Sequence, residues 1–174
     1  MRIAMIIAFQ DFRDEEYFIP KSIFEKEGYE VKTFSTRLGK ALGSYGGVVE
    51  VDAILEDLDI NFFDAIVFCG GQGAKKYIDN EICWQIAKEA VENNKILGAI
   101  CIAPAILAKS GVLNGKNATV WSNPLDKSAI KILTENGAKY VEADVVKDGT
   151  IITANGPQSA RKFAQEIIQA LKEK

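Results

Sequence analysis

The stretch Lys95-Ile-Leu-Gly-Ala-Ile-Cys-Ile-Ala-Pro-Ala-Ile-Leu-Ala-Lys-Ser-Gly111 joins an apolar run to a helix-forming pattern through a single cysteine. Residues 96–100 do not alternate with polar residues, which predicts a strand buried on both faces. Residues 102–109 predict a helix with Pro104 in its first turn, where the missing N–H removes no hydrogen bond. Cys101 therefore stands where a strand turns directly into a helix.

So abrupt a turn usually strains the backbone of the residue at its apex and points the side chain out of the sheet. The helix that follows offers free N–H groups and the positive end of its dipole. Both stabilise a thiolate, so we expect the pKa of Cys101 to lie below its ordinary value of about 8.5. The alternative is that Cys101 is a small core residue, as free cysteines often are. The strand–cysteine–helix setting favours a reactive thiol.

Length, composition and charge indicate a globular protein. The chain has 174 residues, of which 48% are hydrophobic and 26% are charged, and its net charge is −3. These values predict a single domain spanning residues 1–174 with a sizeable core. There is no basic stripe, which argues against a nucleic-acid partner. No apolar run is long enough to cross a bilayer, and residues 1–8 are too short for a signal peptide, so we expect no membrane partner and a cytoplasmic location.

The sequence contains no histidine. This absence excludes Ser-His-Asp and Cys-His catalysis as they are usually built. It also excludes most zinc and iron sites, so we expect neither a metal nor another cofactor. The cysteines, Cys69, Cys83 and Cys101, are odd in number and lack metal-type spacing, and in a reducing compartment they should be free thiols.

Strand and helix patterns alternate along most of the chain. Strands are predicted at 3–8, 29–35, 65–69, 96–100 and 115–121, and helices at 15–27, 81–93, 102–109, 128–134 and 157–172. A polar turn is predicted at 10–14, a helical turn near 54–60, and a small hairpin from 41–43 and 48–51. Residues 140–146 and 151–154 predict either a second hairpin or closely spaced strands. This order predicts an α/β sandwich of three layers, with a mostly parallel sheet between helices. Ligands bind such sheets at the carboxyl ends of the strands.

Three features fall at that edge: the turn after Ala8, the glycines Gly70 and Gly71, and Cys101. A thiolate nucleophile needs a group that orients it and donors for the oxyanion it creates. The backbone N–H groups of Gly71 and Ile102 are the natural donors, although the glycine stretch could also be a plain tight turn.

With no histidine, the orienting group must be a carboxyl, an amide or backbone. Acidic residues 14–16 open the first helix, where acids also favour the helix dipole. We assign Asp14 and Glu15 that electrostatic role, and the sequence leaves Glu16 open between the two roles. Cys69 could be a resolving thiol in a redox cycle, but a buried core position is the more common fate of a free cysteine.

Several segments taken together resemble the ThiJ/PfpI superfamily and follow one another in the right order over nearly the whole chain. They are Phe12-Arg-Asp-Glu-Glu-Tyr-Phe-Ile-Pro20, Phe24-Glu-Lys-Glu-Gly-Tyr-Glu-Val31, Asp64-Ala-Ile-Val-Phe-Cys-Gly-Gly71, Ala99-Ile-Cys-Ile-Ala-Pro104, Ser110-Gly-Val-Leu-Asn-Gly-Lys116, Val146-Lys-Asp-Gly149 and Thr153-Ala-Asn-Gly-Pro157. The resemblance implies a flavodoxin-like fold with an elbow cysteine and usually a homodimer. It further implies Cys101 as the reactive residue, Glu16 as its acidic partner, and Gly71 and Ile102 as the oxyanion donors.

Four positions depart from the family pattern. Ile102 stands where peptidase-like members carry histidine, and Asn123 stands where some carbonyl-processing members carry histidine. Asn155 stands where some members carry arginine, and Cys69 replaces the usual proline. We expect Cys69, Gly70, Asn123 and Asn155 to line the pocket around the reactive thiol. An amide at Asn123 can form hydrogen bonds but cannot act as a general acid or base.

The resemblance implies glyoxalase- or deglycase-type hydrolases, oxidative-stress chaperones or peptidases. Our first hypothesis is a cysteine-dependent enzyme in which Cys101 attacks a small reactive carbonyl compound, or its adduct, to form a hemithioacetal. The second is a stress sensor whose Cys101 is oxidised to sulfinic acid by a small oxidant. A third is a ligand-binding module in which Cys101 is incidental. The lack of histidine makes a peptidase the weakest of the family's activities.

Overall fold

The computed structural model describes residues 1–174 and contains a seven-stranded sheet. From one edge to the other its strands are β11 (Val145–Asp148), β12 (Ile151–Ala154), β8 (Ile96–Ile100), β7 (Ala65–Phe68), β1 (Arg2–Ile6), β3 (Glu30–Ser35) and β6 (Ala53–Ile54). All neighbours are parallel except β11 and β12, which form an antiparallel hairpin. The strands β7 and β8 are buried along their whole length, as their unbroken apolar sequences predict.

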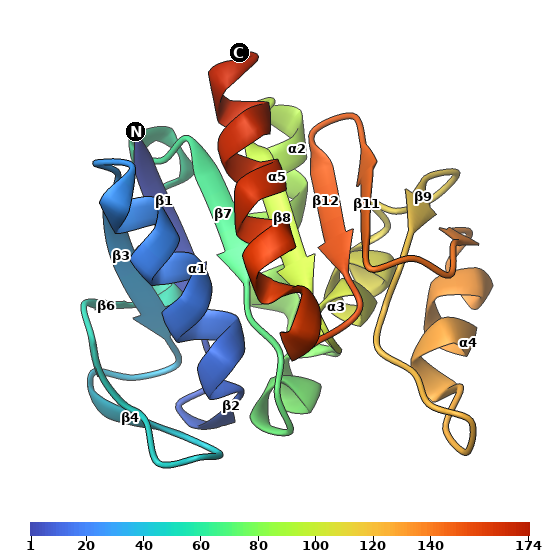
Figure 1. Ribbon diagram of the computed structural model, residues 1–174, viewed down its shortest axis with the longest axis horizontal. Coiled ribbons are helices and arrows are strands. Elements are labelled where there is room, and N and C mark those ends of the chain that lie inside the picture. Colours follow the sequence, from blue (N-terminus) through green and yellow to red (C-terminus); the bar gives the residue numbers. More distant parts are fainter.

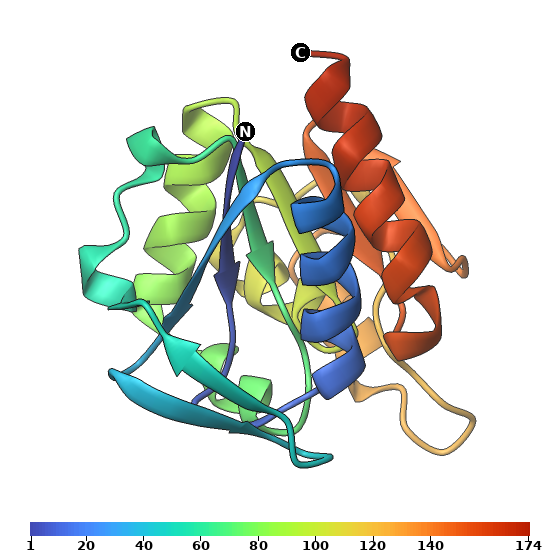
Figure 2. The same ribbon diagram turned by 60° about the vertical axis from the view of Figure 1, so that its left-hand side comes forward.

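Helices cover both faces of this sheet. The helices α1 (Asp14–Lys26) and α5 (Ala160–Lys172) pack together on one face, while α2 (Glu81–Glu92) and α3 (Pro104–Ser110) cover the other (Figure 1). The turned view shows α1 and α2 on opposite sides of β1 and β7 (Figure 2). Beyond β11, α4 (Ser128–Glu135) packs against α3. The predicted α/β sandwich of three layers is thus confirmed, and none of its helices has the length and apolar character needed to span a bilayer.

A smaller sheet lies beside the carboxyl end of β1. It contains β2 (Gln10–Phe12), β4 (Gly39–Gly43) and β5 (Val48–Val51), with β4 and β5 forming the predicted hairpin. The predicted polar turn at 10–14 was wrong in part, because residues 10–12 pair with β4. The Asp14 carboxylate accepts hydrogen bonds from the N–H groups of Tyr45, at 2.8 Å, and Gly47, at 2.7 Å, and so ties the hairpin tip to the start of α1.

Two other predicted segments differ from the structure. The strand expected at 115–121 is reduced to β9 (Asn117–Ala118), which pairs with β10 (Lys139–Tyr140). Thr119 ends that pairing: its N–H donates to Thr153 Oγ1 at 3.0 Å and its own hydroxyl donates to the Ala143 carbonyl at 2.9 Å. These side-chain bonds replace a strand ladder. The region near 54–60 combines β6 with short 3₁₀ turns at 55–57 and 60–62.

Pro20, inside α1, leaves one backbone carbonyl of the helix without its usual hydrogen-bond donor. Pro20 cannot donate a backbone hydrogen bond, so the Glu16 carbonyl lacks the amide that would normally reach it from four residues further on. The Cys69 thiol, at the end of β7, donates to this carbonyl over 3.4 Å instead. This bond fixes the first turn of α1 against the carboxyl end of the sheet.

Candidate functional site

Cys101 occupies a strained elbow between β8 and α3. Its φ angle is 64°, which places a residue other than glycine in the left-handed region, at a typical cost of about 1–3 kcal/mol. Later parts of the chain hold this conformation. The Cys101 N–H donates to the Ala154 carbonyl at 2.9 Å, and the Cys101 carbonyl accepts from the Trp121 N–H at 2.8 Å. The backbone is therefore bent and clamped at the one cysteine that is not fully buried.

The carboxyl group of Glu16 converges with Cys101 in the space around Gly70. Glu16 is completely buried, and its Oε2 accepts a hydrogen bond from the Gly70 N–H at 2.8 Å. A Cβ atom on Gly70 would lie 2.6 Å from that oxygen and 2.7 Å from the Cβ of Cys101, so no larger residue fits between them. Glu16 Oε1 has no geometrically well-formed hydrogen bond, and the carboxyl faces the Cys101 thiol. The first turn of α1 thus delivers a buried acid to the elbow.

Burial dominates the proton affinity of this pair. It raises the pKa of Glu16 to about 7, against the lowering effects of the contacts with Cys101 and the Gly70 N–H. Burial also raises the pKa of Cys101, and the charge and hydrogen bond of Glu16 act in the same direction. The N–H groups of Gly71 and Ile102 lower it by less. The predicted fall in the thiol pKa was therefore wrong, because the desolvation and the adjacent acid outweigh the amides at the helix start.

The N–H groups of Gly71 and Ile102 lie near the Cys101 sulfur and act to lower the pKa of the thiol. Gly71 has a φ angle of 111°, and a Cβ there would lie 2.5 Å from the backbone nitrogen of Arg13. The Arg13 N–H donates to the Gly70 carbonyl at 3.0 Å, which fixes the glycine turn against the entry to α1. The two amides and the sulfur therefore belong to one rigid cluster, in which the amides could also reach an oxyanion formed next to the sulfur.

Cys69 lies behind this cluster and does not open to it. It is buried, its thiol is bonded to the Glu16 carbonyl, and burial raises its pKa well above the ordinary value. This environment fits the core position that is common for free cysteines and gives no support to a resolving thiol. Cys83 is also buried, within α2, and burial raises its pKa to about 12.

The two asparagines expected at the pocket do not line it. Asn123 Oδ1 accepts hydrogen bonds from the N–H groups of Leu125, at 2.8 Å, and Asp126, at 2.7 Å, so its side chain closes a local turn. Asn155 Oδ1 accepts from Ser159 at 2.6 Å, and this residue lines a separate hollow beyond Trp121. Capping of the local backbone explains the position of Asn123. The Asn155 side chain is instead held by side-chain donors, because its Oδ1 also accepts from Gln158 Nε2 at 3.1 Å. The structure thus corrects the pocket prediction for Asn123 and Asn155.

The Cys101 thiol opens into a pocket of about 250 Å³. Its walls combine the glycine turn, the elbow, the tip of the hairpin and the segment after β9: Arg13, Ser44, Tyr45, Gly71, Gln72, Lys75, Cys101, Ile102 and Trp121. Arg13, Tyr45, Lys75 and Trp121 were not among the residues predicted for the site. Arg13 directly precedes the acidic residues that begin α1 and could have been found there, whereas only the folded hairpin reveals Tyr45. Across the chain, no group of three or more Cys, Asp and Glu side chains is arranged to hold a metal ion.

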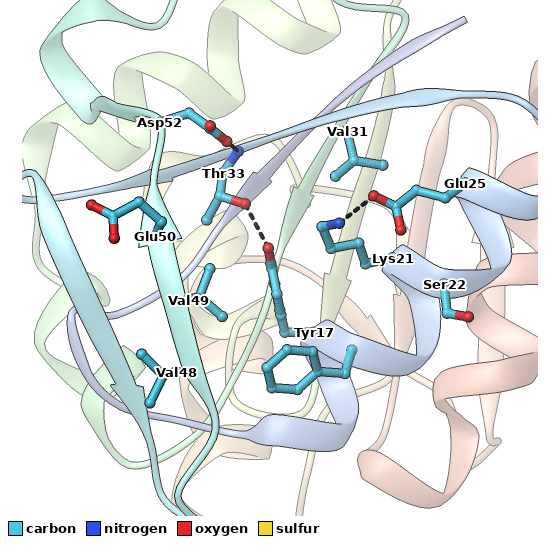
Figure 3. A pocket seen from close by; sticks show the side chains of 11 residues that line it. Tyr17, Lys21, Ser22, Glu25, Val31, Thr33, Val48, Val49, Glu50 and Asp52 are labelled. Carbon is cyan, nitrogen blue, oxygen red and sulfur yellow. Dashed lines mark hydrogen bonds and ion pairs between the residues drawn. The ribbon is translucent and has the colours of Figure 1, made fainter.

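A larger hollow, of about 440 Å³, lies on the other side of α1 (Figure 3). Tyr17 points into it and bonds to Thr33 Oγ1 at 2.6 Å, while Lys21 pairs with Glu25 at its rim. Successive residues of α1 therefore face different spaces, with Glu16 toward the elbow and Tyr17 toward this hollow. The hollow contains no thiol, so the smaller pocket at Cys101 is the candidate active site.

Comparison with known proteins agrees with this architecture. A family model described as the DJ-1/PfpI family matches residues 1–170. An uncharacterized protein of Methanocaldococcus jannaschii is 40% identical over 171 residues, which cover 98% of this chain and 82% of that protein. A deglycase of Pyrococcus abyssi is 31% identical over 172 residues, which cover 99% of this chain and 100% of that protein. The crystal structure of a ThiJ/PfpI domain protein from Brachyspira murdochii superposes with a TM-score of 0.94 at 34% identity and covers 99% of this chain and 97% of that one. The chain belongs to the DJ-1/PfpI family.

Proposed function

We propose that this protein is a cysteine-dependent enzyme that acts on a small reactive carbonyl compound or its adduct, with Cys101 as the nucleophile. The observation that carries this proposal is the convergence of the buried Glu16 carboxyl on the only thiol that opens into a pocket. The name of the Pyrococcus relative, a deglycase, supports the same class of chemistry.

The proton chemistry follows from the coupling of the two groups. With a pKa of about 7, Glu16 retains a proton on a large share of molecules at neutral pH. Because the two groups interact strongly, the first proton to leave belongs to the pair and not to either residue alone. In the reactive state, Cys101 is a thiolate and Glu16 keeps its proton, which it donates in a hydrogen bond to the sulfur. An ionised Glu16 raises the pKa of the thiol, whereas a neutral Glu16 stabilises the thiolate.

The first step then needs no histidine. The thiolate sulfur forms a bond to the aldehyde carbon, and the electron pair of the carbonyl bond moves to its oxygen. The N–H groups of Gly71 and Ile102 stabilise this oxyanion. Glu16 transfers its proton to the oxyanion, which leaves a neutral hemithioacetal on Cys101 and a carboxylate on Glu16. For a dicarbonyl compound such as methylglyoxal, that carboxylate can then take the proton from the hemithioacetal carbon. Return of this proton to the neighbouring carbonyl carbon, with the hydroxyl proton passing to that carbonyl's oxygen, converts the adduct into a thioester. Water hydrolyses the thioester to a hydroxy acid and the free thiol.

The test is the rate of loss of methylglyoxal with purified protein. Cys101→Ser should abolish the activity, and Glu16→Gln should reduce kcat by at least about 100-fold, because proton transfer in the transition state typically contributes that much. Cys83→Ala provides a matched control, since it removes a buried thiol on α2 and should leave kcat unchanged. A rate that is the same in wild type and Cys101→Ser would refute the proposal.

One observation favours a second role as an oxidation sensor. Of the three thiols, only Cys101 is accessible to a dissolved oxidant. Mild peroxide should therefore add two oxygens at Cys101, with the sulfinate held by the neighbouring amides, and should spare Cys69 and Cys83. Mass spectrometry decides the matter: equal oxidation of all three thiols contradicts this role, and selective oxidation without carbonyl activity supports it over the enzyme.

We also propose that the protein is a cytoplasmic homodimer. Exposed apolar side chains gather on α1 and the hairpin, where Phe18 is 39%, Leu42 42% and Val48 53% exposed. Burial of such side chains against a second copy would remove them from water. Light scattering after gel filtration tests the assembly, and Val48→Glu should shift a dimer toward monomer.

A further inference from the structure

The charged side chains that line the Cys101 pocket are all cationic. They are Arg13 and Lys75, and no acidic residue joins them in the lining. This pattern contrasts with the chain as a whole, whose net charge is −3. A pocket built for neutral aldehydes alone gains nothing from two cations at its wall.

Arg13 is fixed in place and partly neutralised. Its guanidinium donates to both carboxylate oxygens of Glu15, at 2.8 and 3.2 Å, and lies 4.6 Å from the ring centre of Tyr45. Asp14 in turn holds the hairpin tip that carries Tyr45. Such fixed contacts reduce the side-chain entropy that would be lost when a ligand binds. Arg13 therefore contributes a rigid cationic wall with a weakened net charge.

Lys75 provides the stronger free charge. It lies in the 3₁₀ segment Gly73–Tyr77, just after the glycine turn, and forms no ion pair within 4 Å. Its charge contributes a little to the lowered pKa of Asp126, which lies outside the pocket lining. The next residue, Lys76, lines a different hollow with Phe9 and Arg37. Two adjacent lysines of identical chemistry thus line different spaces, and only Lys75 lines the pocket that contains Cys101.

We propose that this pocket selects carbonyl compounds that carry an anionic group next to the carbonyl, such as a carboxylate, with Lys75 as the main specificity residue and Arg13 as a supporting one. This inference rests on the proposed function, because it assigns a substrate class to the same thiol. The anionic group is not consumed: it binds the cations while the thiolate adds to the carbonyl carbon. One opposite charge within several ångströms, in a pocket open to water, changes affinity by about threefold to tenfold, and added salt reduces this effect.

Alkylation of Cys101 separates charge selection from enzyme turnover. Iodoacetate and iodoacetamide have similar size and both transfer a carbon to the thiolate with loss of iodide, but only iodoacetate is anionic. The ratio of their rates at Cys101, read by mass spectrometry and referred to the ratio for N-acetylcysteine, measures the preference for an anion. A change in thiol pKa affects both reagents equally and cancels in the ratio.

Lys75→Gln should lower this ratio at least about threefold, and Arg13→Gln should lower it by less. Lys76→Gln is the matched control and should leave it unchanged, and 0.5 M NaCl should bring wild type toward Lys75→Gln. Equal ratios in wild type, Lys75→Gln and Lys76→Gln would overturn the inference while leaving the proposed function intact. A wild-type Cys101 that resists both reagents would instead count against the proposed function.

A binding measurement tests the inference even when the thiol is inert. In Cys101→Ser, the indole N–H signal of Trp121 can be followed by NMR during titration with glycolate or with its neutral counterpart ethylene glycol. Glycolate should shift the Trp121 signal at lower concentration, Lys75→Gln should remove that difference, and Trp84, outside the pocket, should not respond. Identical titrations with the two compounds would refute anion selection.

Discussion

Replacement of Glu16 by glutamine tests the central feature of the site through stability as well as activity. An ordinary glutamate has a pKa of 4.5, and burial raises that of Glu16 to about 7. The difference, at 1.36 kcal/mol for each pKa unit, corresponds to about 3 kcal/mol. Because Glu16 is completely buried, solvent screening does not reduce this figure. Glutamine keeps an oxygen for the Gly70 N–H and cannot ionise, so it avoids the penalty.

The direction in which folding stability changes with pH follows from proton binding to Glu16. Between pH 4.5 and 7 the folded state holds the Glu16 proton more tightly than the unfolded state, so stability falls as pH rises. The contribution is fully present below pH 4.5 and is lost by the time pH has passed 7. Glu16→Gln should therefore match wild type near pH 4.5 and exceed it by up to about 3 kcal/mol at pH 8.

The assay is urea unfolding under reducing conditions at pH 4.5, 6, 7 and 8. The control is Glu15→Gln: the Arg13 hydrogen bond lowers the pKa of Glu15, so its small contribution is present above its unfolded pKa and is lost as pH falls. Since the Glu15 side chain is 41% exposed, solvent screening should keep that effect below about 1 kcal/mol. Parallel stability curves for wild type and Glu16→Gln across this range would refute the assignment of a raised pKa to Glu16.

Three other substitutions probe the surroundings of the site. Cys69→Ala removes the donor to the Glu16 carbonyl and should lower the free energy of unfolding by about 1–2 kcal/mol while methylglyoxal turnover persists, as urea unfolding and kinetics can show. Gly70→Ala forces a Cβ between the Glu16 carboxyl and Cys101. We expect kcat to fall at least about 100-fold and selective alkylation at Cys101 to be lost. A fully active variant would contradict the close packing. Asp14→Ala releases the hairpin tip that carries Tyr45 and should raise KM more than it lowers kcat, with about 1–2 kcal/mol of lost stability; an unchanged KM would show that the tip does not shape the pocket.

The sequence was sufficient for the fold and for the position of the elbow, because both depend on local patterns. Unbroken apolar runs identify β7 and β8, and the change to helical spacing at Cys101 locates the strained turn. The strand predicted at 115–121 was too long, and the turn predicted at 10–14 is partly a strand, because side-chain bonds at Thr119 and a distant hairpin decide the backbone partners there. Such long-range pairings leave no periodic signal.

The site could be predicted only in part. Placing Glu16, Gly71 and Ile102 near Cys101 required the order of strands and a family pattern, and the structure brings these residues together. The direction in which the pKa of the Cys101 thiol shifts could not be predicted, because it depends on how far burial removes the Cys101 and Glu16 side chains from water. The prediction that Asn123 lines the pocket was wrong because its side-chain amide caps its own turn. The sequence cannot distinguish such an amide from one that faces a ligand.

The hydrogen bonds that hold the Cys101 backbone come from residues that are synthesised after it. The backbone of Cys101 is held by Trp121 and by Ala154, which leave the ribosome 20 and 53 residues later. A nascent chain that stops before β12 is complete lacks the acceptor for the Cys101 amide, so its thiol sits on a loose turn without a defined angle of attack. The reactive centre is thus assembled only after β12 has been synthesised, when the sheet into which it is built is already closing.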